Sequence, residues 1–156
     1  MKNKALTSMY EGLMVAAAQY VAERKPPAQN PEDVAAILRP LAQQNALQEC
    51  FWVLLLNARN QVTKVHLVSK GLVDRTQVHA REIFREAIIG NAVRVILSHN
   101  HPGGDPTPSP QDIDCTRNLV SAGKIIGIEV LDHVVLGTVA PERPKDFLSF
   151  REANLL

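Results

Sequence analysis

The sequence has only two cysteines among its 156 residues, Cys50 and Cys115. They form neither a Cys-x-x-Cys pair nor the four-cysteine pattern of a zinc ribbon. A disulfide-stapled scaffold and a cysteine-based metal site are therefore not indicated, and we expect both side chains to be free, buried thiols.

The sequence also lacks a hydrophobic run long enough to span a bilayer. Its N-terminus does not show the charged and then apolar pattern of a signal peptide. These two absences predict a cytoplasmic protein with no membrane association.

There is no excess of charge of either sign: 17 basic and 16 acidic residues give a formal net charge of +1. A dedicated DNA-binding domain usually carries a strong basic excess, so the composition gives no support to nucleic-acid binding. Hydrophobic residues at 46% and charged residues at 21% are ordinary for a globular domain, and the length suffices for one such domain.

Two histidines and an aspartate flank a loop rich in glycine and proline. The apolar residues 93–97 predict a buried strand. His99 and His101 follow two positions apart, so on an extended chain they point to the same side. Asp112 comes after the loop, which can bring the chain back. Two imidazoles and a carboxylate with room for water are what a catalytic zinc requires, so we predict a Zn²⁺ site formed by His99, His101 and Asp112.

A simpler interpretation of part of this pattern is a helix start. Ser109 is a good N-cap, Pro110 suits the first helical position, and Asp112 is favoured by the helix dipole. This explains Ser109 and Asp112 but not two histidines in register at a strand end. The two interpretations are compatible, because a cap that fixes the helix also fixes the direction of Asp112.

The spacing His-x-His, seven residues, Ser-x-x-Asp resembles that of the JAMM (JAB/MPN) zinc metalloproteases. From about Ala46 onward the sequence more narrowly resembles the bacterial RadC family. The stretches that carry this likeness are Glu49-Cys50-Phe51, Arg81-Glu82-Ile83-Phe84, His99-Asn100-His101-Pro102 and Leu131-Asp132-His133. One departure is Gly103, where RadC proteins usually have serine, and we expect it to loosen the loop.

The resemblance implies a zinc-dependent hydrolase of the metallopeptidase or isopeptidase type, in which metal-bound water attacks an amide carbonyl of a peptide or isopeptide. The family's general base is a glutamate on an early strand, for which Glu49 and Glu82 are candidates. We favour Glu49, because it opens a predicted core strand and matches the family position. The family also implies that Ser109 stabilises the oxyanion.

Asp132 and His133 match a motif specific to RadC. They could hydrogen-bond behind the metal ligands or be a feature of a strand end, and direct metal ligation is the less favoured role. Asp105 is most simply a solvated loop residue.

Two other functions compete with hydrolysis. The RadC name implies a DNA repair or recombination accessory protein, whose metal site has another role or no catalytic role. A non-enzymatic scaffold is the third possibility, but scaffold members of the wider fold typically lose the ligands that this chain keeps. RadC proteins usually carry a helix-hairpin-helix segment, and no Gly-centred hairpin is evident here, which predicts a short form without that module.

The element pattern predicts an α/β protein with a mixed sheet and packed helices, and the resemblance implies the cytidine-deaminase-like JAMM/MPN architecture. We divide the chain into an N-terminal helical segment, 1–45, and a RadC-like JAMM/MPN domain, 46–156. The two N-terminal helices should pack on this domain or on a partner, and they are candidates for a homo-oligomer interface. The expected helices are 5–24, 31 onward with a kink or end at Pro40, 79–89 and 110–122. The expected strands are 49–56, 61–68, 93–97, two within 125–139 and one within 147–156.

Overall fold

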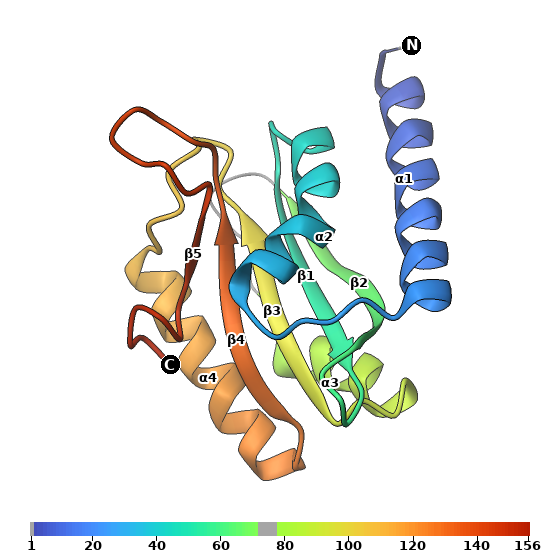
Figure 1. The fold of residues 1–156 in the computed structure, drawn as a ribbon, viewed down its shortest axis with the longest axis vertical. Helices are drawn as coiled ribbons and strands as arrows, with labels where there is room; N and C mark the ends of the chain where they lie inside the picture. Colours follow the sequence, from blue (N-terminus) through green and yellow to red (C-terminus); the bar gives the residue numbers. More distant parts are fainter. Residues whose placement is uncertain (1, 72–77) are drawn as a thin grey trace.

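The computed structural model describes residues 2–71 and 78–156, and within these it contains a five-stranded sheet and four α-helices (Figure 1). The prediction of an α/β protein with a mixed sheet is confirmed. The helices are α1 (Lys2–Arg24), α2 (Pro31–Gln44), α3 (Ala80–Ile89) and α4 (Pro110–Ile126). The strands are β1 (Glu49–Leu56), β2 (Val62–Gly71), β3 (Arg94–Asn100), β4 (Glu129–Leu136) and β5 (Phe147–Ser149).

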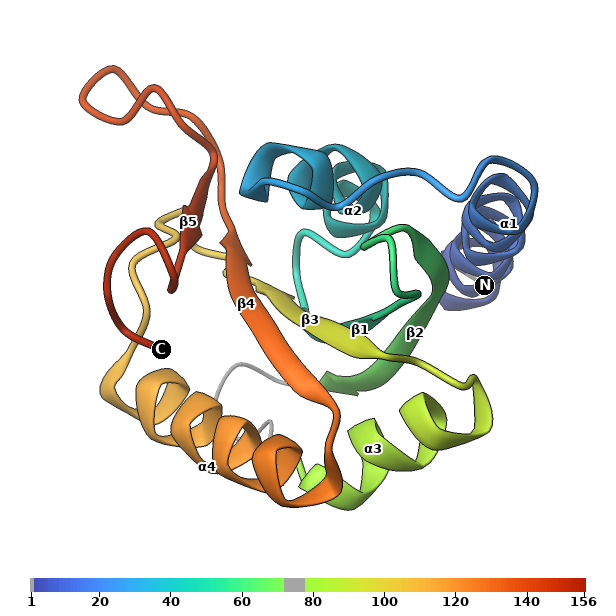
Figure 2. The ribbon, with the colours of Figure 1, turned by 60° about the horizontal axis from the view of Figure 1, so that its bottom comes forward.

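The sheet lies between two layers of helices. Helices α1 and α2 cover one face, and α3 and α4 cover the other (Figure 2). Strand β1 explains this arrangement, because its uninterrupted apolar sequence is buried on both sides. Trp52 and Leu54 pack toward α1 and α2, whereas Val53 and Leu55 pack toward α3 and α4.

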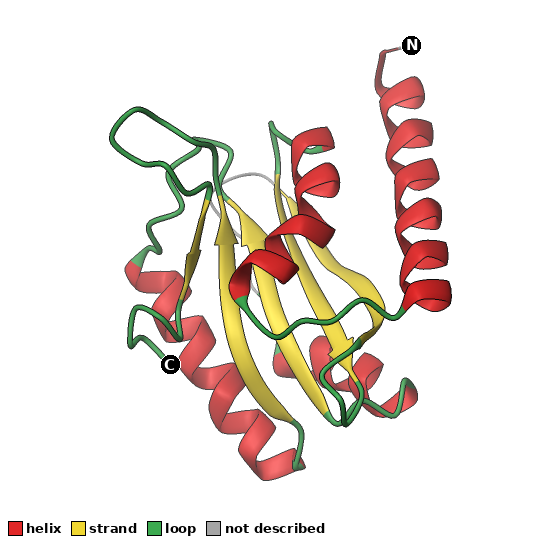
Figure 3. Ribbon diagram, in the orientation of Figure 1, coloured by secondary structure: helices red, strands yellow, loops and turns green. Residues whose placement is uncertain are grey.

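The strand order is β2-β1-β3-β4-β5. Only β3 and β4 are parallel, and α4 connects them; every other neighbouring pair is antiparallel (Figure 3). The carboxyl end of β3 therefore lies near the start of α4. This connection brings His99 and His101 close to Asp112, which is eleven positions further along the chain.

The prediction of two strands within 125–139 is wrong. Residues 125 and 126 end α4, Gly127 stops the helix with φ of 82°, and a single strand, β4, follows. Ile125 and Ile126 suggested a strand because they are apolar, yet they are 88% and 42% exposed on the last turn of the helix. Strand β4 includes residues 131–133, although its register with β3 shifts by one residue between Val130 and Asp132.

Two other boundaries differ from the predictions. Helix α2 continues past Pro40 to Gln44, since buried Leu38 and Leu41 hold it against the sheet and the carbonyl that Pro40 leaves unpaired belongs to exposed Ala36. Strand β2 extends to Gly71, which pairs with Glu49, whereas residues 69–71 were expected to leave the hairpin. The strand expected within 147–156 is present as residues 147–149.

Helix α2 shares its apolar core with β1, β2 and β4. Its N-terminus is fixed by a capping box, in which Asn30 Oδ1 accepts from Asp33 N and Asp33 Oδ2 accepts from Asn30 N. In addition, Arg39 on α2 binds both carboxylate oxygens of Asp146, which precedes β5. Within the described parts of the chain, no helix is both long and apolar enough to cross a membrane.

Candidate metal centre

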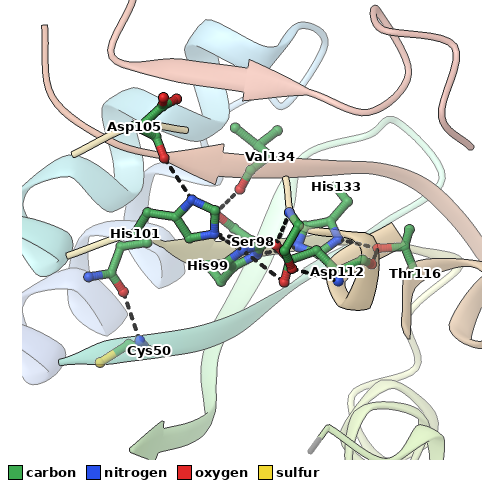
Figure 4. Close-up of polar contacts among 11 residues, drawn as sticks. Cys50, Ser98, His99, His101, Asp105, Asp112, Thr116, His133 and Val134 are labelled. Atoms are coloured by element: carbon green, nitrogen blue, oxygen red, sulfur yellow. Dashed lines mark hydrogen bonds and ion pairs between the residues drawn. The ribbon is translucent and has the colours of Figure 1, made fainter. Parts of the chain in front are cut away.

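The structure brings the three predicted ligands together at the carboxyl end of β3 (Figure 4). His99 comes from the strand itself, His101 from the residue just after it, and Asp112 from the first turn of α4. One possible ligand atom from each lies within 4.8 Å of the others. His99 is almost fully buried, at 1% exposure, whereas His101 and Asp112 are half-buried at the edge of a cleft.

The spacing of the donor atoms suits zinc. Four ligands at about 2.0–2.1 Å in a tetrahedron stand about 3.3 Å from one another. His99 Nε2 lies 3.5 Å from Asp112 Oδ1, His101 Nε2 lies 3.4 Å from Asp112 Oδ2, and the two Nε2 atoms are 2.9 Å apart. A set of two imidazoles and one carboxylate leaves a fourth position free for water or substrate. The residues present therefore fit a catalytic zinc ion.

Asp112 also caps α4, as the helix-start interpretation predicted, while its carboxylate faces the two histidines. Its Oδ2 accepts from Ser109 N at 2.7 Å, and Ser109 Oγ accepts from Asp112 N at 3.1 Å. This capping box fixes the carboxylate beside the histidines. Burial favours the neutral acid, but the contacts with His101 and His99 outweigh burial and hold the pKa of Asp112 well below its usual range.

His101 is oriented from the loop that follows it. Its Nδ1 lies 2.7 Å from the carbonyl oxygen of Asp105, so this nitrogen carries the proton and Nε2 faces the other ligands. The turn between them requires Gly104, which has φ of 86° and packs so closely that a Cβ would stand 2.5 Å from Thr138 Oγ1. Gly103, the departure from the family pattern, has open space around it.

His99 is held on both sides by β1 and β4. Its ring stacks on Phe51, with centroids 5.9 Å apart and planes 2° from parallel. Its Nδ1 lies 2.7 Å from Nε2 of His133, and His133 Nδ1 lies 2.6 Å from Thr116 Oγ1 on α4. Burial lowers the pKa of His133 well below its ordinary value.

Asp132 and His133 point to opposite faces of β4. His133 faces His99, while Asp132 accepts hydrogen bonds from its neighbour's backbone N, from Arg151 N and from Ser149 Oγ. Phe150, held by this arrangement, stacks on the His133 ring at 4.7 Å between centroids. His133 therefore makes the expected hydrogen bond behind a candidate ligand. The strand-end alternative is wrong, because both residues lie inside β4; Asp132 instead binds the C-terminal turn.

Glu49 lies at the same cleft as the candidate ligands. The cleft measures about 1280 Å³, and Glu49, His101, Ser109 and Asp112 all line it. Asn100, between the two histidines, fixes the backbone around Glu49: its Oδ1 accepts from Cys50 N at 2.7 Å and its Nδ2 donates to Gln48 O at 3.0 Å. Burial raises the pKa of Glu49, opposed by His99 and supported by Asp112.

Glu82, the other candidate base, is used differently. Its Oε2 accepts from His79 N at 3.2 Å and so caps α3. It is not among the described residues that line the cleft.

Sequence reasoning missed two contributions to this centre. Thr116 was not singled out, although its position four residues after Asp112 places both on one side of α4. Asp105 was expected to be a solvated loop residue, and its side chain is exposed, but its backbone carbonyl orients His101. A backbone acceptor has no signature in the residue type.

Comparison with known proteins identifies the family of this chain. A family model described as a RadC-like JAB domain matches residues 28–155. A UPF0758 protein of Symbiobacterium thermophilum is 49% identical over 127 residues, which are 81% of this chain and 51% of the relative. UPF0758 proteins of Moorella thermoacetica and Methanosarcina acetivorans are 46% and 41% identical over 81% and 76% of this chain, and over 52% and 51% of their own lengths.

The chain thus spans about half the length of the curated relatives that it matches. The family match covers most of the chain, and it includes all the residues of the candidate centre. The five-stranded mixed sheet with its four helices is consistent with a JAB/MPN-like fold. This chain belongs to the RadC family, as a RadC-like JAB domain.

Proposed function

We propose that this protein is a zinc-dependent hydrolase that cleaves an amide bond in a peptide or isopeptide. The observation that carries the proposal is that Glu49, a carboxylate of raised pKa, lines the same cleft as His101 and Asp112, which with buried His99 form a group that could hold a metal ion. His99, His101 and Asp112 would hold the metal. When bound, zinc supplies a water acidified to a pKa of about 7 and polarises the substrate carbonyl.

Glu49 would act as the proton carrier. Hydrolysis of an amide needs a base that takes a proton from water and then delivers it to the leaving nitrogen. A carboxylate whose pKa is raised by burial suits both steps better than a solvated one. The bonds of Asn100 on either side of Glu49 fix the backbone from which this carboxylate reaches the cleft.

Ser109 would stabilise the oxyanion. Its Oγ already accepts a hydrogen bond from Asp112 N, and none of the hydrogen bonds found for the described residues uses its hydroxyl proton. That proton can point into the cleft and donate to an oxygen that becomes negative during the reaction.

The charge of the cleft favours a peptide over a nucleic acid. Glu49, Asp105, Asp112 and Asp114 line it, and the described lining residues include no lysine or arginine. Such a surface offers a phosphate backbone no basic partner, and protein contacts to phosphate are made mainly by basic side chains. We place the activity in the cytoplasm, where Cys50 and Cys115 would remain the free thiols that the structure shows.

The first test is the metal content of purified wild type beside His101→Ala and Asp112→Ala. We expect about one zinc per chain in wild type and a loss of zinc in both variants. Absence of stoichiometric metal in wild type after purification without chelators would overturn the proposal.

The second test is cleavage of a panel of peptide and isopeptide substrates by the zinc-loaded protein, with Glu49→Gln as the catalytic control. Cleavage by wild type and not by the variant supports the proposal. Salt-dependent DNA binding by a protein that cleaves no amide would instead support the DNA accessory function.

A further inference from the structure

We propose that His133 and Thr116 are positioning residues that fix the tautomer of His99 and tie it to the helix that carries Asp112. Together they form a chain of hydrogen bonds that runs from His99 to the backbone carbonyl of Asp112. This inference rests on the proposed metal site. The comparisons assign no role to either residue.

One assignment of the protons gives every hydrogen bond in this series a single donor and a single acceptor. A histidine that binds zinc through Nε2 must carry its proton on Nδ1. His99 Nδ1 then donates to His133 Nε2 over 2.7 Å, so the proton of His133 must be on its Nδ1. That nitrogen donates to Thr116 Oγ1 over 2.6 Å. The threonine hydroxyl in turn donates to the carbonyl oxygen of Asp112, also over 2.6 Å.

Each member of this chain lacks an alternative partner in solvent. Thr116 is 0% exposed, and His99 and His133 are each 1% exposed. The two rings are also sandwiched, with Phe51 stacked on His99 and Phe150 on His133. A flipped His99 would therefore leave a buried nitrogen unpaired, which is costly.

A threonine in a helix often bonds the carbonyl four residues back, so the contact with Asp112 alone would have no special meaning. Here the same hydroxyl also accepts from a buried imidazole on another element, β4. This acceptor role forces the His133 proton onto Nδ1 and leaves Nε2 as the acceptor for His99. The Thr116 hydroxyl thus decides which atom donates in each of these hydrogen bonds, because its own proton goes to the Asp112 carbonyl in the first turn of α4.

The test compares Thr116→Val with Thr116→Ser. Valine keeps the shape and removes the hydroxyl, whereas serine keeps the hydroxyl. Zinc affinity is measured by competition with a chromophoric chelator. We expect Thr116→Val to bind zinc 10- to 100-fold more weakly than wild type and Thr116→Ser to remain close to wild type. Equal affinities in wild type and in a folded Thr116→Val would overturn the proposal.

A second measurement uses the wild-type protein without metal, so it does not depend on whether a variant folds. Ring ¹⁵N chemical shifts of the histidines in metal-free wild type report which nitrogen carries the proton. We expect a proton on Nδ1 of both His99 and His133, and a His99 whose Nδ1 carries no proton would overturn the inference. A proton on His99 Nε2 does not bear on it, because in the metal-free protein that nitrogen can donate to His101 Nε2, 2.9 Å away. If wild type shows these protons but binds no zinc, the proposed function fails and the hydrogen-bonded chain stands. If wild type binds zinc although His99 Nδ1 carries no proton in the metal-free protein, only the inference fails.

Discussion

Phe51 lies directly opposite His99 in the antiparallel pairing of β1 with β3, and their rings are stacked. Side chains two positions apart on a strand share a face, so Glu49 points to the same side of the sheet as Phe51 and His99. The register of these two strands therefore determines that a glutamate 50 positions before the first histidine faces the candidate metal centre. A shift by one residue would turn Glu49 toward α2.

Replacement of Glu49 by glutamine should abolish hydrolysis while zinc binding is retained. The amide keeps the shape of the side chain but cannot carry the proton, so we expect kcat to fall by roughly 100-fold or more. Kinetics and metal analysis on the same preparation measure both effects. The matched control is Glu82→Gln, because Glu82 only accepts a hydrogen bond from His79 N and a glutamine oxygen can do the same. Equal losses in the two variants would contradict the role of Glu49.

The loop after His101 should tolerate serine at Gly103 but not alanine at Gly104. A side chain at Gly103 meets no atom within 4 Å, whereas Gly104 has positive φ and its Cβ would clash with Thr138 Oγ1. We expect Gly104→Ala to lower the free energy of unfolding by roughly 1–2 kcal/mol, the penalty for a left-handed conformation, and to weaken zinc binding because Asp105 would move. Gly103→Ser should match wild type in chemical denaturation and zinc titration. A destabilised Gly103→Ser variant would show that the loop needs glycine at both positions.

The ion pair between Arg39 and Asp146 should make stability depend on pH in the acid range. The hydrogen bonds from Arg39 lower the pKa of Asp146. The pair therefore stabilises the folded state fully above the ordinary aspartate pKa of about 4, and this contribution disappears as pH falls toward the lower folded value. At pH 7 we expect Asp146→Asn to lose roughly 1 kcal/mol of unfolding free energy. Urea denaturation from pH 7 to pH 3 should show the difference between the two proteins shrinking, and a constant difference would contradict the assignment.

Asp132 should stabilise the C-terminal turn. Its carboxylate accepts from two backbone N–H groups and from Ser149 Oγ; two of these bonds are buried and the one from Arg151 N is partly buried. Asp132→Ala would leave these donors unpaired, and we expect a loss of roughly 1–3 kcal/mol in unfolding free energy. Glu142→Ala, on an exposed loop position, is the control and should change stability by less than about 0.5 kcal/mol. If both substitutions changed the unfolding free energy equally, Asp132 would not stabilise the C-terminal turn through these hydrogen bonds.

The sequence alone determined the local elements and the identity of the candidate ligands. An uninterrupted apolar run predicted β1 correctly, and the Ser109-Pro110 start predicted the N-terminus of α4, because such signals depend only on neighbouring residues. Residue type and spacing likewise predicted the His-x-His pair and Asp112 as candidate metal ligands. Residues 125–139 were misread because apolar residues at a helix end and in a strand look alike until the left-handed Gly127 separates them.

The tertiary structure alone decided how the centre is supported. The pairing of β3 with β4 places His133 beside His99, the packing of α4 on the sheet brings Thr116 to His133, and the loop turns the Asp105 carbonyl toward His101. None of these contacts follows from a motif, because each joins residues on separate elements or uses a backbone atom common to every residue. Their geometry arises only when the sheet register and helix packing are fixed together.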